Sequence, residues 1–253
     1  MKFCDFHIHT NYSDGELSLR EVVDLYGRAG FGAIAITDHL CDRKSLLGLS
    51  AKYLDWTLTE ENFYQYLKEI EKEAIRARLK YNMLVIPGVE ITYNSFKYAR
   101  SAHILALGIK DFIDPDQEIK NIFKGIRQQG ALSVAAHPVS TKVNEPQTYY
   151  LWNHRESLRD LCDLWEVASG SYLFEEVMNS DLPKIANSDF HIRKHFSSWK
   201  TVLPSGGSWA EVKKHLLNGN LQFKFFHEQE GEKCLRQVLK VREGSITVLE
   251  ELW

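Results

Sequence analysis

The sequence predicts an α/β fold in which strands and helices alternate and close into a barrel. One observation is a succession of short apolar runs separated by helical patterns, which is typical of strands covered by helices. The other is that most of these runs end in a histidine or an acidic residue. Because the carboxyl ends of barrel strands open on one face, such residues would meet in one pocket.

The first expected strand lies in the opening stretch, residues 2–10, and carries the opening motif. Asp5, His7 and His9 alternate with apolar residues, so they share one face of the strand. Two histidines at this spacing can chelate one ion from the same side, and neutral imidazole is a common ligand for zinc and related metals. Taken alone, the pattern is equally typical of a half-buried edge strand with two incidental histidines.

The next helix and strand indicate a βαβ unit. Ser18 and Glu21 have the spacing of a capping box, so the helix is expected to start at Ser18 and to end near residue 29. The run 33–37 is then a buried strand with Asp38 and His39 at its polar end. A strand, a helix and a second buried strand favour a parallel sheet.

A hairpin is expected in the middle of the chain. The strand over 83–90 ends in Glu90, and the apolar run 102–108 begins only about a dozen residues later, too few for a helical crossover. The turn is therefore expected around 94–100. The other expected elements are an irregular stretch at 41–58, helices over 59–80, 114–129, 148–159 and 173–178 and from Ser208, and strands over 132–137, 164–167, 184–188, 199–203 and 221–226.

Composition and charge are those of a soluble globular protein, and one domain is expected to cover residues 1–253. The net charge of -3 gives no electrostatic reason for binding to bulk nucleic acid or to a membrane. No uncharged run approaches the ~20 residues that span a bilayer, and no signal-peptide core is visible. The four cysteines form no CxxC pair, so we expect neither disulfides nor a thiolate zinc site, and a cytoplasmic location.

The polar residues at the strand ends form a candidate metal site. A lone histidine there is more often a hydrogen-bonded rim residue, but six histidines and three acids exceed what one ion takes. We expect two or three divalent ions, with Glu90 as the natural bridge, and the absence of cysteine favours Zn, Mn or Fe. The candidate ligands are His7, His9, Asp14, His39, Glu90, His103, His137, Asp189 and His191.

Together the motifs resemble the PHP (polymerase and histidinol phosphatase) family of metal-dependent phosphoesterases. The resemblance rests on HxH at 7–9, SDG at 13–15, TDH at 37–39, GVE at 88–90, AHP at 136–138 and NSDFH at 187–191, in family order over residues 3–191. It implies a distorted (β/α)7 barrel that the C-terminal strands and helices complete. It also implies three ligand sets: His7, His9, Glu90 and Asp189 for one metal, Glu90, His103 and His137 for a second, and Asp14, His39 and His191 for a third.

The resemblance further implies hydrolysis of a phosphate ester by a metal-activated hydroxide, so that no serine or cysteine nucleophile is needed. Glu90, Asp189 and His191 are the expected catalytic residues.

Four more residues are expected to support this site. Asp5 and Asp38 are interpreted as acceptors that orient imidazole N–H groups, although capping or ion pairing at a strand end is an equally good interpretation. Arg193 and Arg43 are the expected phosphate-binding cations, because a guanidinium suits a bidentate contact with phosphate oxygens.

The predicted function is therefore that of an enzyme acting on a small phosphorylated substrate, such as a nucleotide, a nucleoside bisphosphate or a histidinol-phosphate-like monoester. The alternative is a phosphodiesterase or exonuclease on short oligonucleotides, which would need a basic, aromatic groove that the sequence does not show. A non-catalytic metal-binding module would be expected to have lost ligands. An amidohydrolase would bridge its metals with a modified lysine, whereas Glu90 has that position here.

Overall fold

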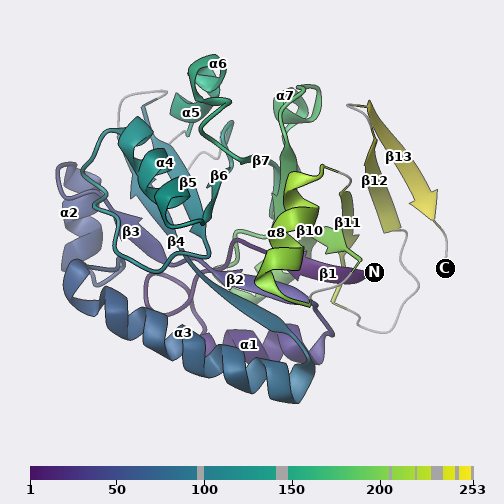
Figure 1. Cartoon of the computed structure of the whole chain (residues 1–253), viewed down its shortest axis with the longest axis horizontal. Helices are drawn as coiled ribbons and strands as arrows, with labels where there is room; N and C mark the ends of the chain where they lie inside the picture. The colour runs from purple at the N-terminus through teal and green to yellow at the C-terminus, as the bar shows by residue number, and fades with distance from the viewer. Residues whose placement is uncertain are drawn as a thin grey trace.

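The protein is a mixed α/β structure with a strongly curled sheet, as predicted (Figure 1). The computed structural model describes residues 1–95, 100–140, 148–204, 207–219 and 221–228, together with the backbone of 236–242 and 245–251. The strands around the sheet are, in order, β1 (Lys2–Asp5), β2 (Ala33–Ile36), β4 (Leu84–Tyr93), β5 (Ala102–Leu107), β6 (Leu132–Ala135), β7 (Leu164–Ser169) and β9 (Lys184–Asn187).

The two ends of this strand series meet just beyond β1 and β9. Ile8 and Phe190 form an isolated parallel bridge there. The amide of His9 donates to the carbonyl of Phe190 (2.8 Å), and the amide of Phe190 donates to the carbonyl of His7 (3.1 Å). This contact brings the first histidine motif beside the NSDFH motif, which lies about 180 residues away in the sequence.

One strand of the barrel runs in the opposite direction. β5 pairs antiparallel with β4 and with β6, while β1–β2, β2–β4, β6–β7 and β7–β9 are parallel. The pairing of β4 with β5 confirms the predicted hairpin, and residues 96–99 of its turn lie outside the described residues. The expectation that the ligands follow the carboxyl ends of parallel strands is wrong for His103. It lies near the amino end of β5, opposite Thr92, and reaches the same pocket because β5 is reversed.

Helices cover the outside of the sheet (Figure 1). α1 (Leu19–Arg28) begins with the predicted capping box of Ser18 and Glu21. α8 (Trp209–Leu217) begins with a capping box of Ser208 and Glu211. α3 (Glu60–Tyr81) packs against α1 and β4. α4 (Ile119–Gln128) begins later than predicted, because the Asp114 side chain accepts from the Asp116 amide in a turn before it.

Several elements differ from the sequence prediction. The stretch 41–58 contains a helix, α2 (Leu46–Tyr53), whose side chains Leu46 and Tyr53 are largely exposed, so it lacks the apolar period of a packed helix. The predicted helix over 148–159 is two short ones, α5 (Tyr150–Asn153) and α6 (Arg155–Leu158), interrupted at His154. The remaining short elements are β3 (His39–Cys41), β8 (Tyr172–Leu173), α7 (Glu175–Met178) and η1 (Arg193–Phe196).

The C-terminal strands continue the sheet beyond β1. β10 (Ser198–Leu203) pairs antiparallel with β1, and β11 (Gln222–Phe226), β12 (Arg236–Arg242) and β13 (Ser245–Glu251) follow, each antiparallel to the one before. β12 and β13 were not expected from the sequence. That the whole chain is one domain stays a prediction.

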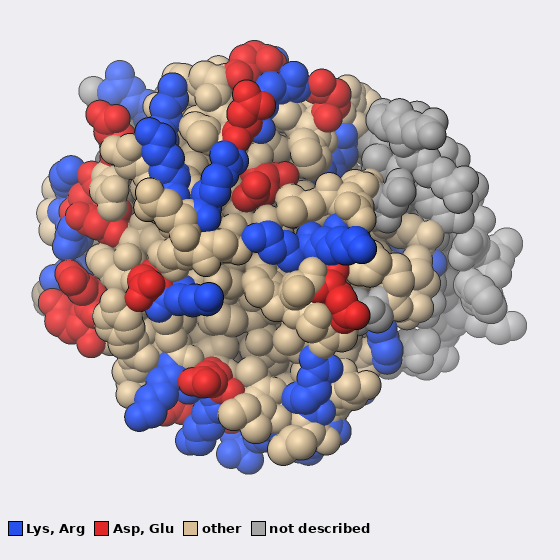
Figure 2. All heavy atoms as spheres, viewed as in Figure 1, with Lys and Arg blue, Asp and Glu red and all other residues tan. Residues whose placement is uncertain are grey.

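The described surface has mixed charge. On the face in Figure 2, Lys and Arg side chains are interspersed with Asp and Glu, without a continuous basic stripe among the residues that are described. None of the described helices has the length and apolar character needed to span a membrane.

Candidate metal centre

The nine predicted ligands converge at the end of the barrel where β1 and β9 meet. Their ligand atoms form four overlapping groups, and within each group all atoms lie within 4.8 Å of one another. The groups are His9, Asp14, His39 and His191; His7, His137 and Asp189; His7, His9 and Glu90; and Glu90, His103 and His137. Since the groups share members, the geometry supports a polynuclear site.

Glu90 is at the centre of this arrangement. It is fully buried on β4, and its two oxygens face different imidazoles. The distances are 3.0 Å from Oε1 to His103 Nδ1, 3.3 Å to His137 Nε2 and 3.5 Å to His7 Nε2, and 2.8 Å from Oε2 to His39 Nδ1 and 3.6 Å to His9 Nε2. A carboxylate with ligand nitrogens around both oxygens has the geometry expected of a bridging ligand.

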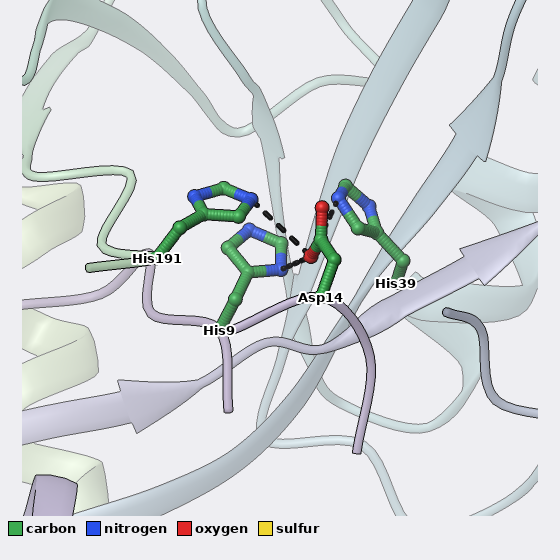
Figure 3. Close-up of side chains that lie close together, drawn as sticks. All are labelled: His9, Asp14, His39 and His191. Atoms are coloured by element: carbon green, nitrogen blue, oxygen red, sulfur yellow. Dashed lines mark ion pairs between the residues drawn. The ribbon is translucent and has the colours of Figure 1, made fainter. Parts of the chain in front are cut away.

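The Asp14 cluster, which we define as His9, Asp14, His39 and His191, forms the more open part of the site (Figure 3). Asp14 Oδ1 lies 3.4 Å from His191 Nε2, 3.5 Å from His39 Nε2 and 3.9 Å from His9 Nδ1. The other ring nitrogen of His9 faces Glu90 and Asp189, so this imidazole lies between two groups. The resemblance had assigned it to one.

The outer ring nitrogens of four imidazoles are hydrogen-bonded to oxygen atoms, which favours one tautomer of each. The partners are Glu166 for His7 (2.9 Å), Asn94 for His103 (2.8 Å), Thr148 for His137 (3.2 Å) and the Asp189 carbonyl for His191 (3.0 Å). His39 differs, because its Nδ1 lies 2.8 Å both from the hydroxyl of Thr92 and from Oε2 of Glu90, and its Nε2 faces Asp14. The hydroxyl of Thr92 donates to a carbonyl, as does that of Thr148, so each accepts from its imidazole. The second ring nitrogen of each imidazole is therefore left with a lone pair that points into the site.

Several buried atoms at the centre have no hydrogen-bond partner among the described residues. They are Nε2 of His7, both ring nitrogens of His9 and Oε2 of Glu90, whose 2.8 Å contact with His39 Nδ1 lacks hydrogen-bond geometry. Such atoms are rare in folded proteins, because an unsatisfied buried polar group is costly. A divalent cation would satisfy all of them, and a set of nitrogen and oxygen donors without thiolate suits Zn, Mn or Fe. The residues therefore fit a bound metal.

Two of the ligands have left-handed backbone conformations. His137 has φ 27° and Asp189 has φ 53°, a region that residues other than glycine seldom occupy. Such conformations cost roughly 1–3 kcal/mol each and persist only where the surroundings hold them. Both residues lie two positions beyond the end of a barrel strand, β6 or β9, and their strained backbones turn the side chains into the site.

Glu166 is the residue that the sequence analysis missed. It is fully buried on β7, and it accepts from His7 Nδ1 (2.9 Å), from the amide of His137 (2.7 Å) and from Asn187 (2.9 Å). It thus holds two predicted ligands in place. The available signal was an acid in the middle of the apolar run 164–167.

Asp5 and Asp38 do not orient imidazoles through any described hydrogen bond. Asp5 accepts from Tyr26, Ser188 and Lys200, and Asp38 accepts from Thr10 and Ser13. The alternative interpretation, capping and ion pairing at a strand end, is the one that agrees with these contacts. Glu166 has the role that was expected of them.

The carboxylates of the site favour protonation of most of its imidazoles. Burial lowers the pKa of His7, but Glu166, Asp189 and Glu90 outweigh it, so that the pKa lies well above its ordinary value. Burial also lowers the pKa of His191, but the carboxylates of Asp189 and Asp14 outweigh it and raise this pKa to about 9. His9 and His103 are the exceptions. Burial and the neighbouring imidazoles of His191 and His39 lower the pKa of His9 to about 3, and burial, which Glu90 opposes, lowers the pKa of His103. Nearby imidazoles outweigh burial at Glu90 and Asp189, and hold the pKa of both carboxyls well below the ordinary range.

The two predicted phosphate-binding arginines are engaged elsewhere in the structure. Arg43 pairs with Asp114 (2.6 Å) and Asp116 (2.7 Å), and Arg193 pairs with Glu228. Their contact with substrate stays a prediction.

His195, which is not among the predicted ligands, lies against two of them. Its Nδ1 is 3.2 Å from the carbonyl of Asp189 and 3.3 Å from the amide of His191. No motif of the sequence had pointed to it.

A cavity of about 1190 Å³ borders the site at Asp189. The charged and aromatic residues of its described lining are Tyr149, Tyr172, Phe174, Glu175, Glu176, Asp189, Lys194 and His195. The hydroxyl of Ser169, which is buried and has no described hydrogen-bond partner, also belongs to the lining. The cavity gives a small molecule access to the site at Asp189.

Comparison with known proteins agrees with this site. A family profile described as the PHP domain matches residues 5–250. A stretch of 150 residues, 57% of the chain, is 26% identical to "DNA polymerase/3'-5' exonuclease PolX" of Bacillus subtilis (strain 168) and covers 25% of that protein. The chain thus matches only a quarter of the length of this curated relative.

Two solved structures share the fold. One is a two-domain protein from Bacteroides vulgatus containing a predicted PHP-like metal-dependent phosphoesterase, with a TM-score of 0.63, 20% identity, and coverage of 99% of this chain and 76% of that one. The other is an amidohydrolase from Chromobacterium violaceum with bound sulfate, with a TM-score of 0.53, 16% identity, and coverage of 83% and 96%. The curled barrel, the motifs in order along it and the profile match over almost its whole length show that the chain belongs to the PHP domain family.

Proposed function

We propose that the protein is a metal-dependent phosphoesterase that hydrolyses a small phosphomonoester. The observation that carries the proposal is the convergence of unpartnered buried nitrogen and oxygen atoms around Glu90, beside a cavity that opens at Asp189. The family resemblance supports the reaction class. Glu90, Asp189 and His191 would be the catalytic residues.

The ligand sets for the ions follow from the groups in the structure. Glu90 would be shared between His7 and His9 on one side and His103 and His137 on the other, and the Asp14 cluster would hold a further ion. Divalent ions bound there would supply an activated water and positive charge next to the phosphoryl oxygens. The protein's own contribution is to keep the ligands aimed inward, through Glu166 and the other outer acceptors.

The cavity lining favours a monoester with a polar organic group over an oligonucleotide. Its basic residues are Lys194 and His195, and Glu175 and Glu176 of the same lining add negative charge. A strand of nucleic acid would bring several phosphates, each needing a cation, into this mixed lining. The described surface in Figure 2 also has no basic stripe that would guide such a strand.

A phosphodiesterase or exonuclease that trims short oligonucleotides is the second candidate. The printed name of the Bacillus subtilis relative favours it, because that name includes a 3'-5' exonuclease. Two exposed aromatic side chains, Tyr53 and Trp56, lie near Lys52 and could stack on unpaired bases.

The test is to load the purified protein with Mn²⁺ or Zn²⁺ and assay it against a panel. The panel contains a nucleoside monophosphate, a nucleoside 3',5'-bisphosphate, histidinol phosphate and a short single-stranded RNA and DNA. Release of phosphate from a monoester, lost in Glu90→Gln, is the expected result. Faster shortening of an oligonucleotide would favour the second candidate, and a metal-loaded protein that hydrolyses none of them would contradict both.

A further inference from the structure

A fully buried ion pair lies directly beneath the metal site. Nζ of Lys200 on β10 is 2.8 Å from Oδ2 of Asp5, the last residue of β1, and both side chains have no exposed surface. The antiparallel register, with Cys4 opposite Thr201, places them side by side. Removing two charges from water costs several kcal/mol per ion, and a buried lysine is rare. Because a buried ion pair contributes little net stability, we expect this one to have a further role.

The carboxylate of Asp5 gathers donors from several elements. It accepts from the hydroxyl of Tyr26 on α1 (2.8 Å), from the amide of Ser188 (3.0 Å) and from the hydroxyl of Ser188 (2.6 Å), in addition to Lys200. Both carboxylate oxygens are in use. Ser188 directly precedes Asp189, so two of these four contacts fix the peptide that carries a predicted ligand.

The position of Ser188 matters because Asp189 is strained. With φ 53°, its backbone would relax toward an ordinary conformation if the preceding residue were free to move. That relaxation would turn its carboxylate away from His7 and His9, whose Nε2 atoms lie 3.4 Å and 3.6 Å from Oδ1. The hydrogen bonds from Ser188 to Asp5 oppose it.

Lys200 in turn holds Asp5. Its Nζ also donates to the hydroxyl of Ser198 (2.6 Å), and the Tyr26 and Phe196 rings lie 5.9 Å and 6.0 Å away. Burial lowers the pKa of Lys200 and the charge of Asp5 opposes this. An apolar residue in this place would leave a buried carboxylate without its counter-ion.

We infer that Lys200 is a positioning residue for the metal site, acting through Asp5 and Ser188 on the conformation of Asp189. This inference rests on the proposed metal site. It does not depend on which phosphate ester is the substrate. Lys200 itself touches neither the predicted ligands nor the cavity among the described contacts.

The first test compares Lys200→Met with Lys184→Met. Lys184 is also buried, on β9, but its Nζ donates to the carbonyls of Ser180 and Leu182, away from the site. Metal affinity is measured by competition with a chromophoric chelator for Mn²⁺ or Zn²⁺, and folding by near-UV circular dichroism. We expect Lys200→Met to lose roughly 10–100-fold in affinity, as for other residues that orient ligands, and Lys184→Met to stay within about threefold.

A second variant keeps the inference testable if Lys200→Met does not fold. Ser188→Ala removes one hydrogen bond to Asp5 without leaving a buried charge, and we expect it to fold and to lose affinity several-fold. Unchanged affinity in folded Lys200→Met, or in Ser188→Ala, would overturn the inference. A wild-type protein that binds metal but hydrolyses no phosphate ester would contradict the proposed function alone.

Discussion

Oε1 of Glu166 lies 2.9 Å from Nδ1 of His7, and both side chains are fully buried. The other oxygen of Glu166 accepts from the amide of His137, 2.7 Å away, so one carboxylate holds two ligands that come from opposite parts of the chain. Because the bond at Nδ1 fixes the tautomer of His7, its Nε2 presents a lone pair to Glu90. The metal site therefore depends on a residue that need not touch a metal.

Replacing Glu166 should weaken metal binding while leaving the fold intact. In Glu166→Gln the side chain keeps its size, but its amide nitrogen faces one of its present donors, so the imidazole of His7 or the amide of His137 loses its acceptor. We expect the affinity for Mn²⁺ or Zn²⁺ to fall by roughly 10–100-fold in a chelator competition titration. Glu73→Gln is the matched control, a buried acid that pairs with Arg76 on α3, and unchanged affinity in Glu166→Gln would rule out the role.

Glu90→Ala should lose metal and turnover together. Since Glu90 faces imidazoles with both oxygens, its loss removes a ligand from two adjoining groups. Transition-state stabilisation by bound metal is worth several kcal/mol, so we expect phosphate release to fall by about 10³-fold or more, with metal content measured by elemental analysis. His154→Ala should be nearly silent, because its described bond is to the carbonyl of Tyr150 on α5. An inactive His154→Ala would mean that the predicted set of catalytic and ligand residues is wrong.

The ligand set could be predicted from the sequence because its members lie in short motifs at the ends of apolar runs. HxH just beyond β1 and Asp189 with His191 just beyond β9 are local patterns, and the barrel brings them together through the bridge between Ile8 and Phe190. The ordering of the strands along the chain was enough to place them at one end of the fold.

What could not be predicted depends on tertiary contacts. Glu166 resembles any acid inside a strand until His7 is placed beside it. The contribution of His103 follows from the reversed direction of β5, which the hairpin implied but the ligand pattern did not. The helix α2 has exposed leucines, so no apolar period marked it, and the ion pairs of Arg43 with Asp114 and Asp116 join segments about 70 residues apart.

Asp24 should contribute stability that depends on pH. It accepts from Tyr81 and pairs with Arg76 at 2.6 Å, and these contacts outweigh burial and lower its pKa to about 2. A carboxyl with a lowered pKa stabilises the fold above its ordinary pKa, near 4, and loses this effect as the pH falls through about 2. Asp24→Asn should therefore lower the free energy of unfolding by about 1 kcal/mol at pH 7, and by less at pH 3, in urea titrations. The exposed Asp55→Asn is the control, and a loss that does not shrink at pH 3 would show that the charge of Asp24 is not its cause.

Metal should stabilise the fold through the buried atoms that have no partner. Nε2 of His7 and Oε2 of Glu90 are held close together as potential metal ligands only in the folded chain. A cation that binds them therefore favours folding by mass action. At a free metal concentration of 100 times Kd the gain is about 2.7 kcal/mol, which corresponds to a rise in Tm of roughly 5–10 °C for a chain of this size. Differential scanning calorimetry with EDTA, and then with Mn²⁺ or Zn²⁺, measures this rise in Tm.

Exposed histidines could also bind metal, but they would do so in the unfolded chain as well and would not raise Tm. The rise should therefore persist in His154→Ala and shrink in Glu90→Gln, which changes a ligand in two of the four groups. A Tm indifferent to metal in the wild-type protein would mean that these atoms are not ligands.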